Sequence, residues 1–148
     1  MKMVTHFEVE VHGIPVAQGS MVRNVFGLRY YNHKALMDWR HNVMKELVHS
    51  RPDGWDDAAP IEVIATFVFP RPASHFGTGK NANRLRPSAP EHKVTAPDLD
   101  KLTRACGDAI EEAGIVHNDA QICGWEVLKR YAETSETPGA LLSIMRLP

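Results

Sequence analysis

A disulfide framework, a membrane span and a basic excess are all missing from this sequence of 148 residues. Its two cysteines, Cys106 and Cys123, are too few for a framework. Both fall in predicted regular elements, so we expect buried, reduced thiols, with a disulfide between them as the alternative. The absence of an apolar run of about 18 residues excludes a membrane-spanning helix. The first residues lack the apolar core of a signal peptide, so we expect a cytoplasmic protein.

The charge balance is close to neutral. Lys and Arg number 17 against 18 Asp and Glu, which gives a formal net charge of −1 and a pI of about 6.7. No overall positive field attracts nucleic acid, so any DNA-binding surface must come from local clusters of charge. The length predicts one domain over 1–148 with a core that needs no disulfide or metal. No Walker loop, zinc-type Cys/His spacing or internal repeat occurs.

Apolar periodicity predicts an α/β fold. Spacings typical of strands occur over 7–11, 25–31, 61–69, 122–131 and 139–147. Spacings of three and four residues predict helices over 33–50 and 99–113. Because 61–69 is apolar on both sides, we expect it in the centre of a mixed sheet of four or five strands. We also expect both helices on one face and the last strand beside the strand that precedes it.

Three aspartates surround the second helix. Asp98 is expected at the N-cap, which places Asp100 in the first turn, and Asp119 lies in an Asn-Asp turn. A helix of about 15 residues carries the chain roughly 22 Å, and about six extended residues recover about 20 Å, so Asp119 can lie beside Asp98. Mg²⁺ prefers such oxygen ligands. The alternative is that these aspartates only stabilise a helix N-terminus and a turn.

The segment 71–93 concentrates positive charge. It is rich in Gly, Pro, Ser and Asn and lacks periodicity, which is typical of a functional or mobile loop. Against the single acid Glu91 it has an excess of four positive charges (5 − 1), from Arg71, Lys80, Arg84, Arg86 and Lys93. Such a strip fits DNA phosphates and leads directly to Asp98. The alternative is a solubilising surface loop.

The order Asp98-Leu-Asp-Lys-Leu, helix and Asn118-Asp-Ala-Gln resembles the RusA family of Holliday junction resolvases. That family comprises small, homodimeric, magnesium-dependent endodeoxyribonucleases of bacteria and phages. The resemblance implies that Asp98, Asp100 and Asp119 are the catalytic, metal-binding acids. Arg104 stands where the family typically has a lysine, with Lys101 as a nearer neighbour. Arginine stays charged, so it cannot donate a proton at neutral pH.

The resemblance also directs attention to a Gly-x-Pro loop in which the family often has basic residues. In this sequence Gln18 and Met21 stand at some of these places, and only Arg23 remains as a candidate DNA contact. The alternative for this loop is a plain hairpin turn. Lys129, in the strand 122–131, is a further candidate DNA contact or a surface residue.

From the residues and the resemblance together, we expect an endonuclease that cuts branched DNA, in particular Holliday junctions, by paired phosphodiester hydrolysis. Mg²⁺ is the expected cofactor, with Mn²⁺ as a plausible substitute, and a symmetric homodimer supplies two sites. The expected location is the bacterial cytoplasm, with a bacterial or phage gene. The alternatives are a non-catalytic DNA-binding module and a metal hydrolase of small phosphate esters.

Overall fold

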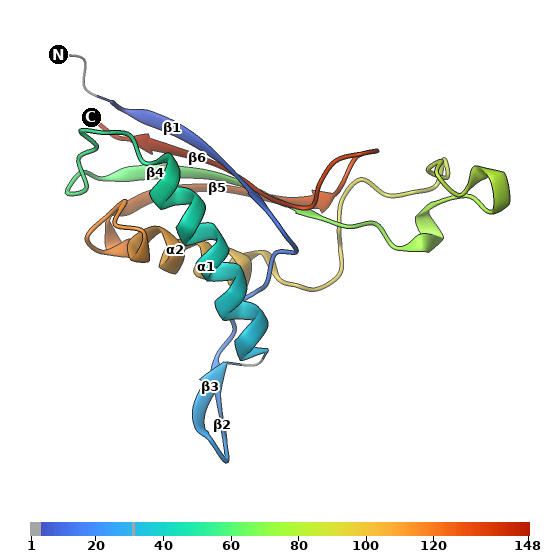
Figure 1. Cartoon of the computed structure of the whole chain (residues 1–148), viewed down its shortest axis with the longest axis horizontal. Helices are drawn as coiled ribbons and strands as arrows, with labels where there is room; N and C mark the ends of the chain where they lie inside the picture. Colours follow the sequence, from blue (N-terminus) through green and yellow to red (C-terminus); the bar gives the residue numbers. More distant parts are fainter. Residues whose placement is uncertain (1–3, 31) are drawn as a thin grey trace.

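The computed structural model describes residues 4–30 and 32–148 as a sheet layer and a helix layer with two projections (Figure 1). The main sheet has the order β1–β6–β4–β5, with bounds His6–His12, Gly139–Arg146, Ile61–Phe69 and Ile122–Tyr131. Strand β6 runs antiparallel to β1 and β4, whereas β4 and β5 are parallel. The predicted α/β fold, with the apolar strand over 61–69 inside a mixed sheet, is confirmed.

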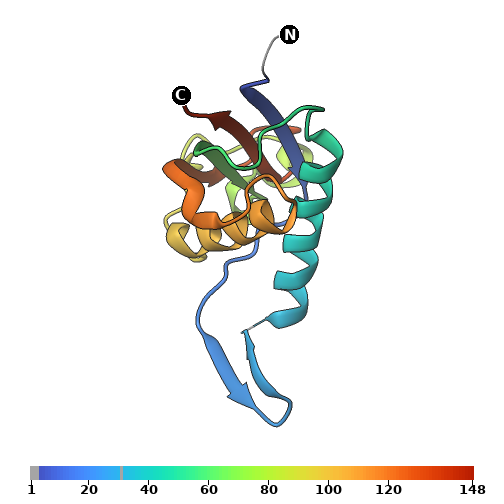
Figure 2. The same cartoon turned by 90° about the vertical axis from the view of Figure 1, so that its left-hand side faces the viewer.

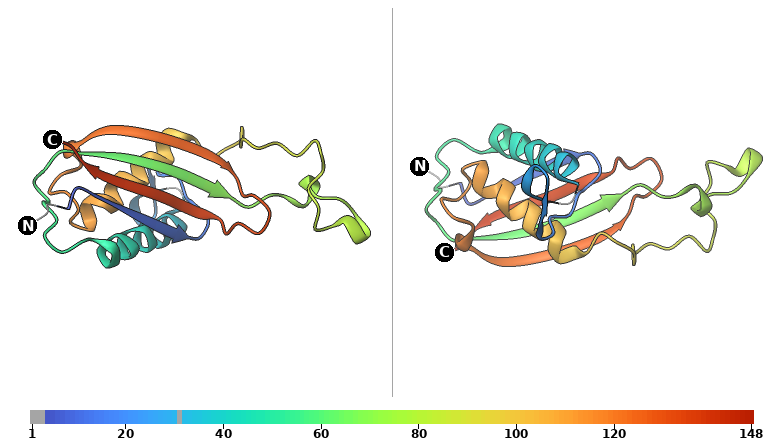
Figure 3. Two further views of the ribbon diagram at one scale, coloured as in Figure 1. Left: turned by 90° about the horizontal axis from the view of Figure 1, so that it is seen from above. Right: turned by 90° about the horizontal axis from the view of Figure 1, so that it is seen from below.

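The helices α1 (His33–Ser50) and α2 (Leu99–Glu112) cover the same face of the sheet, as predicted (Figure 3). Each helix buries one stripe of side chains against the sheet and the other helix. The buried stripe of α2 includes Leu102, Cys106 and Ile110, all less than 2 % exposed. Because α2 connects the parallel strands β4 and β5, it is the crossover that such a pair requires. The residues that flank α2 therefore lie near the ends of the sheet.

The last strand, β6, lies between β1 and β4, so the expectation that it pairs with β5 was wrong. Ile144 of β6 is opposite Phe7 on one side and opposite Val63 on the other. Strand β5 reaches the edge of the sheet because it pairs in parallel with β4 after the helical crossover. Gly139 begins β6 so close to β1 that an added Cβ would lie 1.8 Å from the Val11 carbonyl oxygen. Only glycine fits this position.

Residues 21–30 form a β-hairpin that projects from the body of the molecule and is called the arm below (Figure 2). Strands β2 (Met21–Asn24) and β3 (Gly27–Tyr30) form a two-stranded sheet of their own. The predicted strand over 25–31 therefore covers β3, but Val25 and Phe26 form the turn and β2 was not foreseen. Tyr31 lies outside the described residues. Because nine of the ten arm residues are exposed, no buried alternation marks β2.

Residues 71–93, called the basic loop below, form the second projection between β4 and α2 (Figure 1). The loop contains two short 3₁₀ turns, Ala73–His75 and Gly79–Asn81. Its two halves are also joined, because the Gly77 N–H donates to the Arg84 carbonyl at 2.9 Å. The predicted lack of long regular elements is confirmed, although the loop folds back on itself. Its mobility stays a prediction.

The two cysteines lie in different environments. Cys106 is buried, and this burial raises the pKa of its thiol to about 12. Cys123 is exposed, so the expectation of two buried thiols was wrong. The pairing of β4 with β5 passes from Ile122 to Gly124, which leaves Cys123 as the extra residue of a β-bulge. Both thiols are free, which excludes the disulfide alternative.

No helix within the described residues combines the length and the hydropathy needed to cross a membrane.

Candidate active site

The candidate site begins at Asp98, at the N-terminus of α2. Asp98 is the N-cap residue, as predicted, with extended backbone angles of φ −70° and ψ 140°. Its side chain, however, makes no capping hydrogen bond. The carboxylate lies 3.4 Å from the Lys101 ammonium group and the side chain is 62 % exposed. The simple role of a helix cap therefore does not account for this carboxylate, which is accessible to a ligand.

The backbone before Asp98 is fixed by two lysines. The Lys129 ammonium group on β5 donates to the carbonyl oxygens of Thr95 and Pro97, both at 2.7 Å. Lys93 donates to the Thr95 hydroxyl oxygen at 2.8 Å. Because two of three ammonium donors of Lys129 are engaged in this way, its visible role is to position the segment that leads to Asp98. A direct DNA contact by Lys129 stays a prediction.

Asp100 and Arg104 lie one helical turn apart on α2, so they share one side of the helix. Both side chains are exposed. The Thr103 hydroxyl group donates a hydrogen bond to the Leu99 carbonyl oxygen at 2.8 Å. The Thr103 side chain therefore packs against the first turn of its own helix. An acid and a permanent cation consequently face solvent together at the start of α2.

Asp119 follows α2 in a turn whose shape is set by its neighbours. Asn118 and Gln121 form a capping box around the short 3₁₀ helix Asp119–Gln121. The Asp119 N–H donates to the Glu111 carboxylate at 3.0 Å, which joins the turn to the last turn of α2. The Gln121 amide donates to two carbonyls of the α1–β4 loop, those of Asp57 and Ala59, both at 3.0 Å. Of these contacts only the one with Glu111 involves Asp119, through its backbone N–H, and the Asp119 side chain is exposed.

Two hollows lie along α2. The first, called the Asp119 hollow, has a volume of about 330 Å³ and is lined by Arg104, Asp119, Asp108 and Trp125, among others. The second, called the Asp98 hollow, has a volume of about 650 Å³ and is lined by Asp98, Lys101, Ser20 and Asn32, among others. Each hollow therefore contains one predicted acid and one predicted cation. Asp100 lines neither hollow.

The structure thus brings Arg104 toward Asp119 and Lys101 toward Asp98, but it does not gather the three acids around one point. Within residues 4–30 and 32–148, no three His, Cys, Asp or Glu side chains converge on a ready-made metal site. The donor set still fits Mg²⁺, because this ion binds oxygen and is usually held by one or two carboxylates with waters and substrate phosphates. Convergence of all three acids on one ion stays a prediction.

A buried polar network, missed by sequence reasoning, ties the arm to α2. Gln18 is 8 % exposed and donates its side-chain N–H to Asp108 Oδ2 at 2.7 Å. Its carbonyl oxygen accepts from Arg40 Nη1 of α1 at 3.3 Å. Its backbone N–H donates to the Lys101 carbonyl at 2.9 Å, and Arg40 also pairs with Glu112. A lone glutamine in an irregular segment carries no periodic signal, so the sequence offered no means to find this role.

The seven predicted DNA-binding cations divide into two groups. Arg71, Lys93 and Lys129 make internal contacts. Arg71 donates to the carbonyls of Ala132 and Pro90 at 2.7 and 2.6 Å and lies over the Tyr131 ring. The other four side chains are exposed on the two projections: Arg23 on the arm, and Lys80, Arg84 and Arg86 on the basic loop. The exposed group is the better placed for phosphate contacts.

The base of the basic loop is held by an ion pair between Arg130 and Glu136. Arg130 donates from Nη1 and Nη2 to both carboxylate oxygens of Glu136, at 2.5 and 2.8 Å. This hydrogen bonding lowers the pKa of the Glu136 carboxyl from its usual range and raises the pKa of Arg130. The backbone of Arg130 also forms an isolated antiparallel β-bridge with that of His92. The strand end and the returning loop are therefore joined beside the approach to Asp98.

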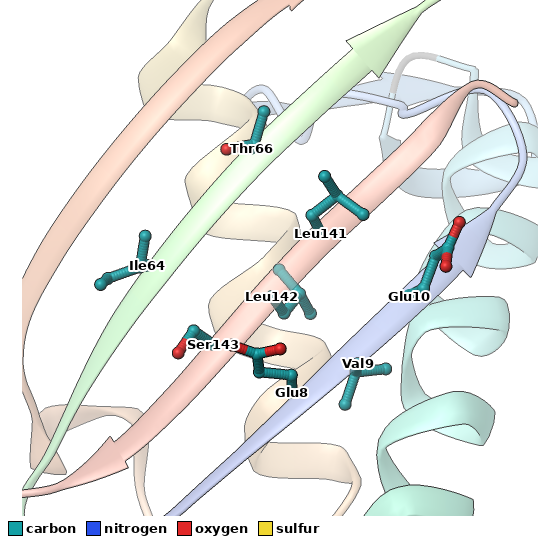
Figure 4. Close-up of a pocket in the computed structure, with 8 residues that line it drawn as sticks. All are labelled: Glu8, Val9, Glu10, Ile64, Thr66, Leu141, Leu142 and Ser143. Carbon is teal, nitrogen blue, oxygen red and sulfur yellow. The ribbon is translucent and has the colours of Figure 1, made fainter. Parts of the chain in front are cut away.

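The uncovered face of the sheet has a hollow of its own, shown in Figure 4. Its lining combines Glu8 and Glu10 of β1 with apolar side chains such as Ile64 and Leu141. Among the described residues, two carboxylates and no Lys or Arg line this hollow, so it would repel a phosphate. The chemistry of DNA binding therefore favours the α2 side of the molecule.

The comparison with protein families confirms the resemblance found in the sequence. The family model described as endodeoxyribonuclease RusA matches residues 13–141. The match includes the arm, the basic loop, both hollows along α2 and the three aspartates. A comparison with curated proteins found no significant match.

Proposed function

Because this chain belongs to the RusA endodeoxyribonuclease family, we propose that it resolves Holliday junctions and related branched DNA by magnesium-dependent hydrolysis. The observation that carries the proposal is the environment of the Asp98 carboxylate. This residue occupies an N-cap position, yet its carboxylate is left uncapped, exposed and beside Lys101. A residue that served the helix alone would accept a hydrogen bond from the first turn.

Asp98, Asp100 and Asp119 are the residues that would hold the divalent cation, one or two at a time together with a DNA phosphate. When bound, such a cation lowers the pKa of a water molecule and stabilises the departing oxygen of the phosphodiester. Arg104 lines the same hollow as Asp119, and it would stabilise the negative charge that develops on the attacked phosphate. Its permanent charge suits this electrostatic role and not proton transfer.

Lys101 and Lys129 contribute through position. The Lys101 ammonium group lies 3.4 Å from the Asp98 carboxylate and orients it. Lys129 fixes the backbone of Thr95 and Pro97, directly before Asp98. The exposed cations of the two projections would bind the phosphates of the DNA arms, which supports affinity without sequence preference.

Paired hydrolysis of a junction requires two sites, and we propose a symmetric homodimer, since two-fold dimers are the commonest oligomers. Each protomer would then cut one of two opposed strands. The oligomeric state follows from light scattering of the purified protein, and a monomer that remains a monomer on the junction would contradict the paired mechanism.

The central experiment compares a synthetic four-way junction with a linear duplex of the same sequence. We expect symmetric nicks in the junction with Mg²⁺ or Mn²⁺, and no cleavage with EDTA. Asp100→Asn should keep junction binding and lose cleavage. Asp53→Asn, an exposed aspartate in the α1–β4 loop, is the matched control and should cleave normally. An intact junction under all metal conditions would refute the proposal.

A second candidate is a DNA-binding module without catalysis. It is favoured by one observation, the lack of a preformed group of three metal-binding side chains within the described residues. The same assay separates the two functions. A binding module would retard the junction in a gel with the same affinity for the wild type and Asp100→Asn, and neither protein would cut it.

A further inference from the structure

The arm exposes apolar side chains that no part of the core requires. Val25 and Phe26 at its turn are 92 % and 78 % exposed, and Leu28 is 61 % exposed. Side chains this exposed bury little apolar area, so they contribute little to the stability of the fold. Exposed aromatic and aliphatic groups that gather at one point of a surface indicate a binding site.

Phe26 lies in the two-residue turn between β2 and β3. The Phe26 N–H donates to Asn24 Oδ1 at 2.8 Å. Gly27 follows with φ at +103°, a value that favours glycine. The turn geometry therefore depends on Asn24 and Gly27, and the Phe26 ring remains exposed.

The two faces of the arm each combine a cation with an apolar side chain. Across the hairpin, Arg23 is opposite Leu28 and Val22 is opposite Arg29. The sequence has no Asp or Glu between Glu10 and Asp38, so no acid offsets these charges locally. A second copy of this arm would meet the same positive charge, whereas DNA phosphates complement it. Charge complementarity therefore favours nucleic acid over self-association.

The base of the arm adjoins the candidate active site. The Gln18 N–H, three residues before β2, donates to the Lys101 carbonyl of α2 at 2.9 Å. Ser20 and Asn32, which flank the arm in the sequence, line the same hollow as Asp98. Four extended residues span roughly 13 Å, which corresponds to about four base steps at 3.4 Å each. DNA held at Asp98 would therefore lie within reach of the tip.

We propose that the arm is a wedge that recognises the branch point of the DNA. Phe26, supported by Val25, stacks on a base that is exposed where the duplex is interrupted, and Arg23 and Arg29 bind the phosphates on either side. Apolar side chains that enter between bases and separate them are a known chemical means to recognise deformed DNA. The inference rests on the proposed function for the identity of the substrate, branched DNA.

The test uses junctions that carry 2-aminopurine at the branch point, with EDTA present so that no strand is cut. We expect the full-length wild-type protein to raise the fluorescence, because binding unstacks the base. Phe26→Ala should abolish this rise and weaken junction binding by about 5- to 150-fold, the range for loss of one base–aromatic stack. Its affinity for linear duplex should not change. Val25→Ser should give a smaller loss, and Val48→Ala, an exposed valine of α1, is the control.

The arginines are tested by salt dependence. Arg23→Gln and Arg29→Gln should each reduce the slope of log K against log salt by about 0.9 per lost phosphate contact. Lys45→Gln, an exposed lysine of α1, should leave the slope unchanged. An unchanged slope in both arginine variants would contradict the phosphate contacts of the arm.

Other outcomes overturn the inference and leave the proposed function in place. If Phe26→Ala binds the junction and raises the fluorescence as the wild type does, the arm is not a wedge. If Phe26→Ala instead dissociates an oligomer in light scattering, the arm is a contact between protomers. Conversely, a wild type that cuts no junction but loses branch binding through Phe26→Ala would refute the nuclease and support the wedge.

Discussion

The side-chain amide of Gln18 donates to Asp108 Oδ2 at 2.7 Å, so the segment that leads into the arm is fastened to the second half of α2. The same side chain accepts from Arg40 of α1 at 3.3 Å. One buried residue therefore connects both helices with the base of the arm. Through this connection, the orientation of the arm depends on the helix that also bears Asp98 and Arg104.

We predict that Gln18→Ala lowers the free energy of unfolding by about 1–3 kcal/mol, because Asp108 and Arg40 lose a buried partner. The free energy of unfolding of Gln18→Glu should be lower still, because a second carboxylate replaces the amide group that donates to Asp108. Urea unfolding followed by circular dichroism measures both effects. Asn83→Ala, at an exposed amide in the basic loop, is the control and should unfold as the wild type does. Equal stability of all three variants would show that the network contributes nothing.

Arg104 offers a test of which property of the family's basic residue is needed. If the charge alone stabilises the attacked phosphate, Arg104→Lys should retain most of the junction-cutting rate. Arg104→Met keeps a similar volume without charge and should lower the rate constant by about 10²- to 10³-fold, as for the loss of one transition-state donor. Junction binding should change little. A neutral variant that cuts at the wild-type rate would remove Arg104 from the mechanism.

The split between exposed and internally bonded cations predicts different salt behaviour. Arg84→Gln and Arg86→Gln should each reduce the slope of log K against log salt by about 0.9 if each residue neutralises one phosphate. Lys129→Gln should keep the slope but slow cleavage, because the carbonyls of Thr95 and Pro97 lose their donor. Fluorescence anisotropy at several salt concentrations measures the slopes. A reduced slope for Lys129→Gln would assign it to DNA contact.

The two thiols should differ in reactivity. The native protein is expected to react with one equivalent of a thiol reagent, at the exposed Cys123. Burial raises the pKa of Cys106 to about 12, so at pH 8 only roughly one molecule in ten thousand carries its nucleophilic thiolate. Raising the pH toward that value increases the thiolate fraction. Cys123→Ser should therefore react only after unfolding, and fast reaction of that variant in its native state would contradict the burial of Cys106.

The sequence predicted those parts of the fold that depend on local periodicity. The alternation of Phe7, Val9 and Val11 and the apolar stripe of α2 each reflect burial on one side, so both elements were found. The position of β6 was not predictable in the same way, since pairing with β1 and β4 is decided by the whole sheet. Strand β2 was not predicted, because its residues are exposed on both faces and show no alternation of apolar and polar side chains.

In the candidate site, too, local features were predictable from the sequence and contacts between distant residues were not. The positions of Asp98 at the N-cap and Asp119 in a polar turn followed from residue preferences. The separation of the acids between two hollows depends on side-chain directions, which the spacing of residues does not determine. The internal contacts of Lys129 likewise depend on β5 lying beside the segment before α2, a relationship between distant parts of the chain.

Since Asp98 precedes α2 and Asp119 follows it, the length of this helix sets the distance between the two hollows. One residue inserted within α2 would turn one end against the other by about 100° and lengthen the helix by about 1.5 Å. The inserted residue would also turn part of the buried stripe toward solvent. The fold therefore tolerates changes of chain length in the arm and the basic loop, whose ends are fixed independently of their tips, but not between Leu99 and Glu112.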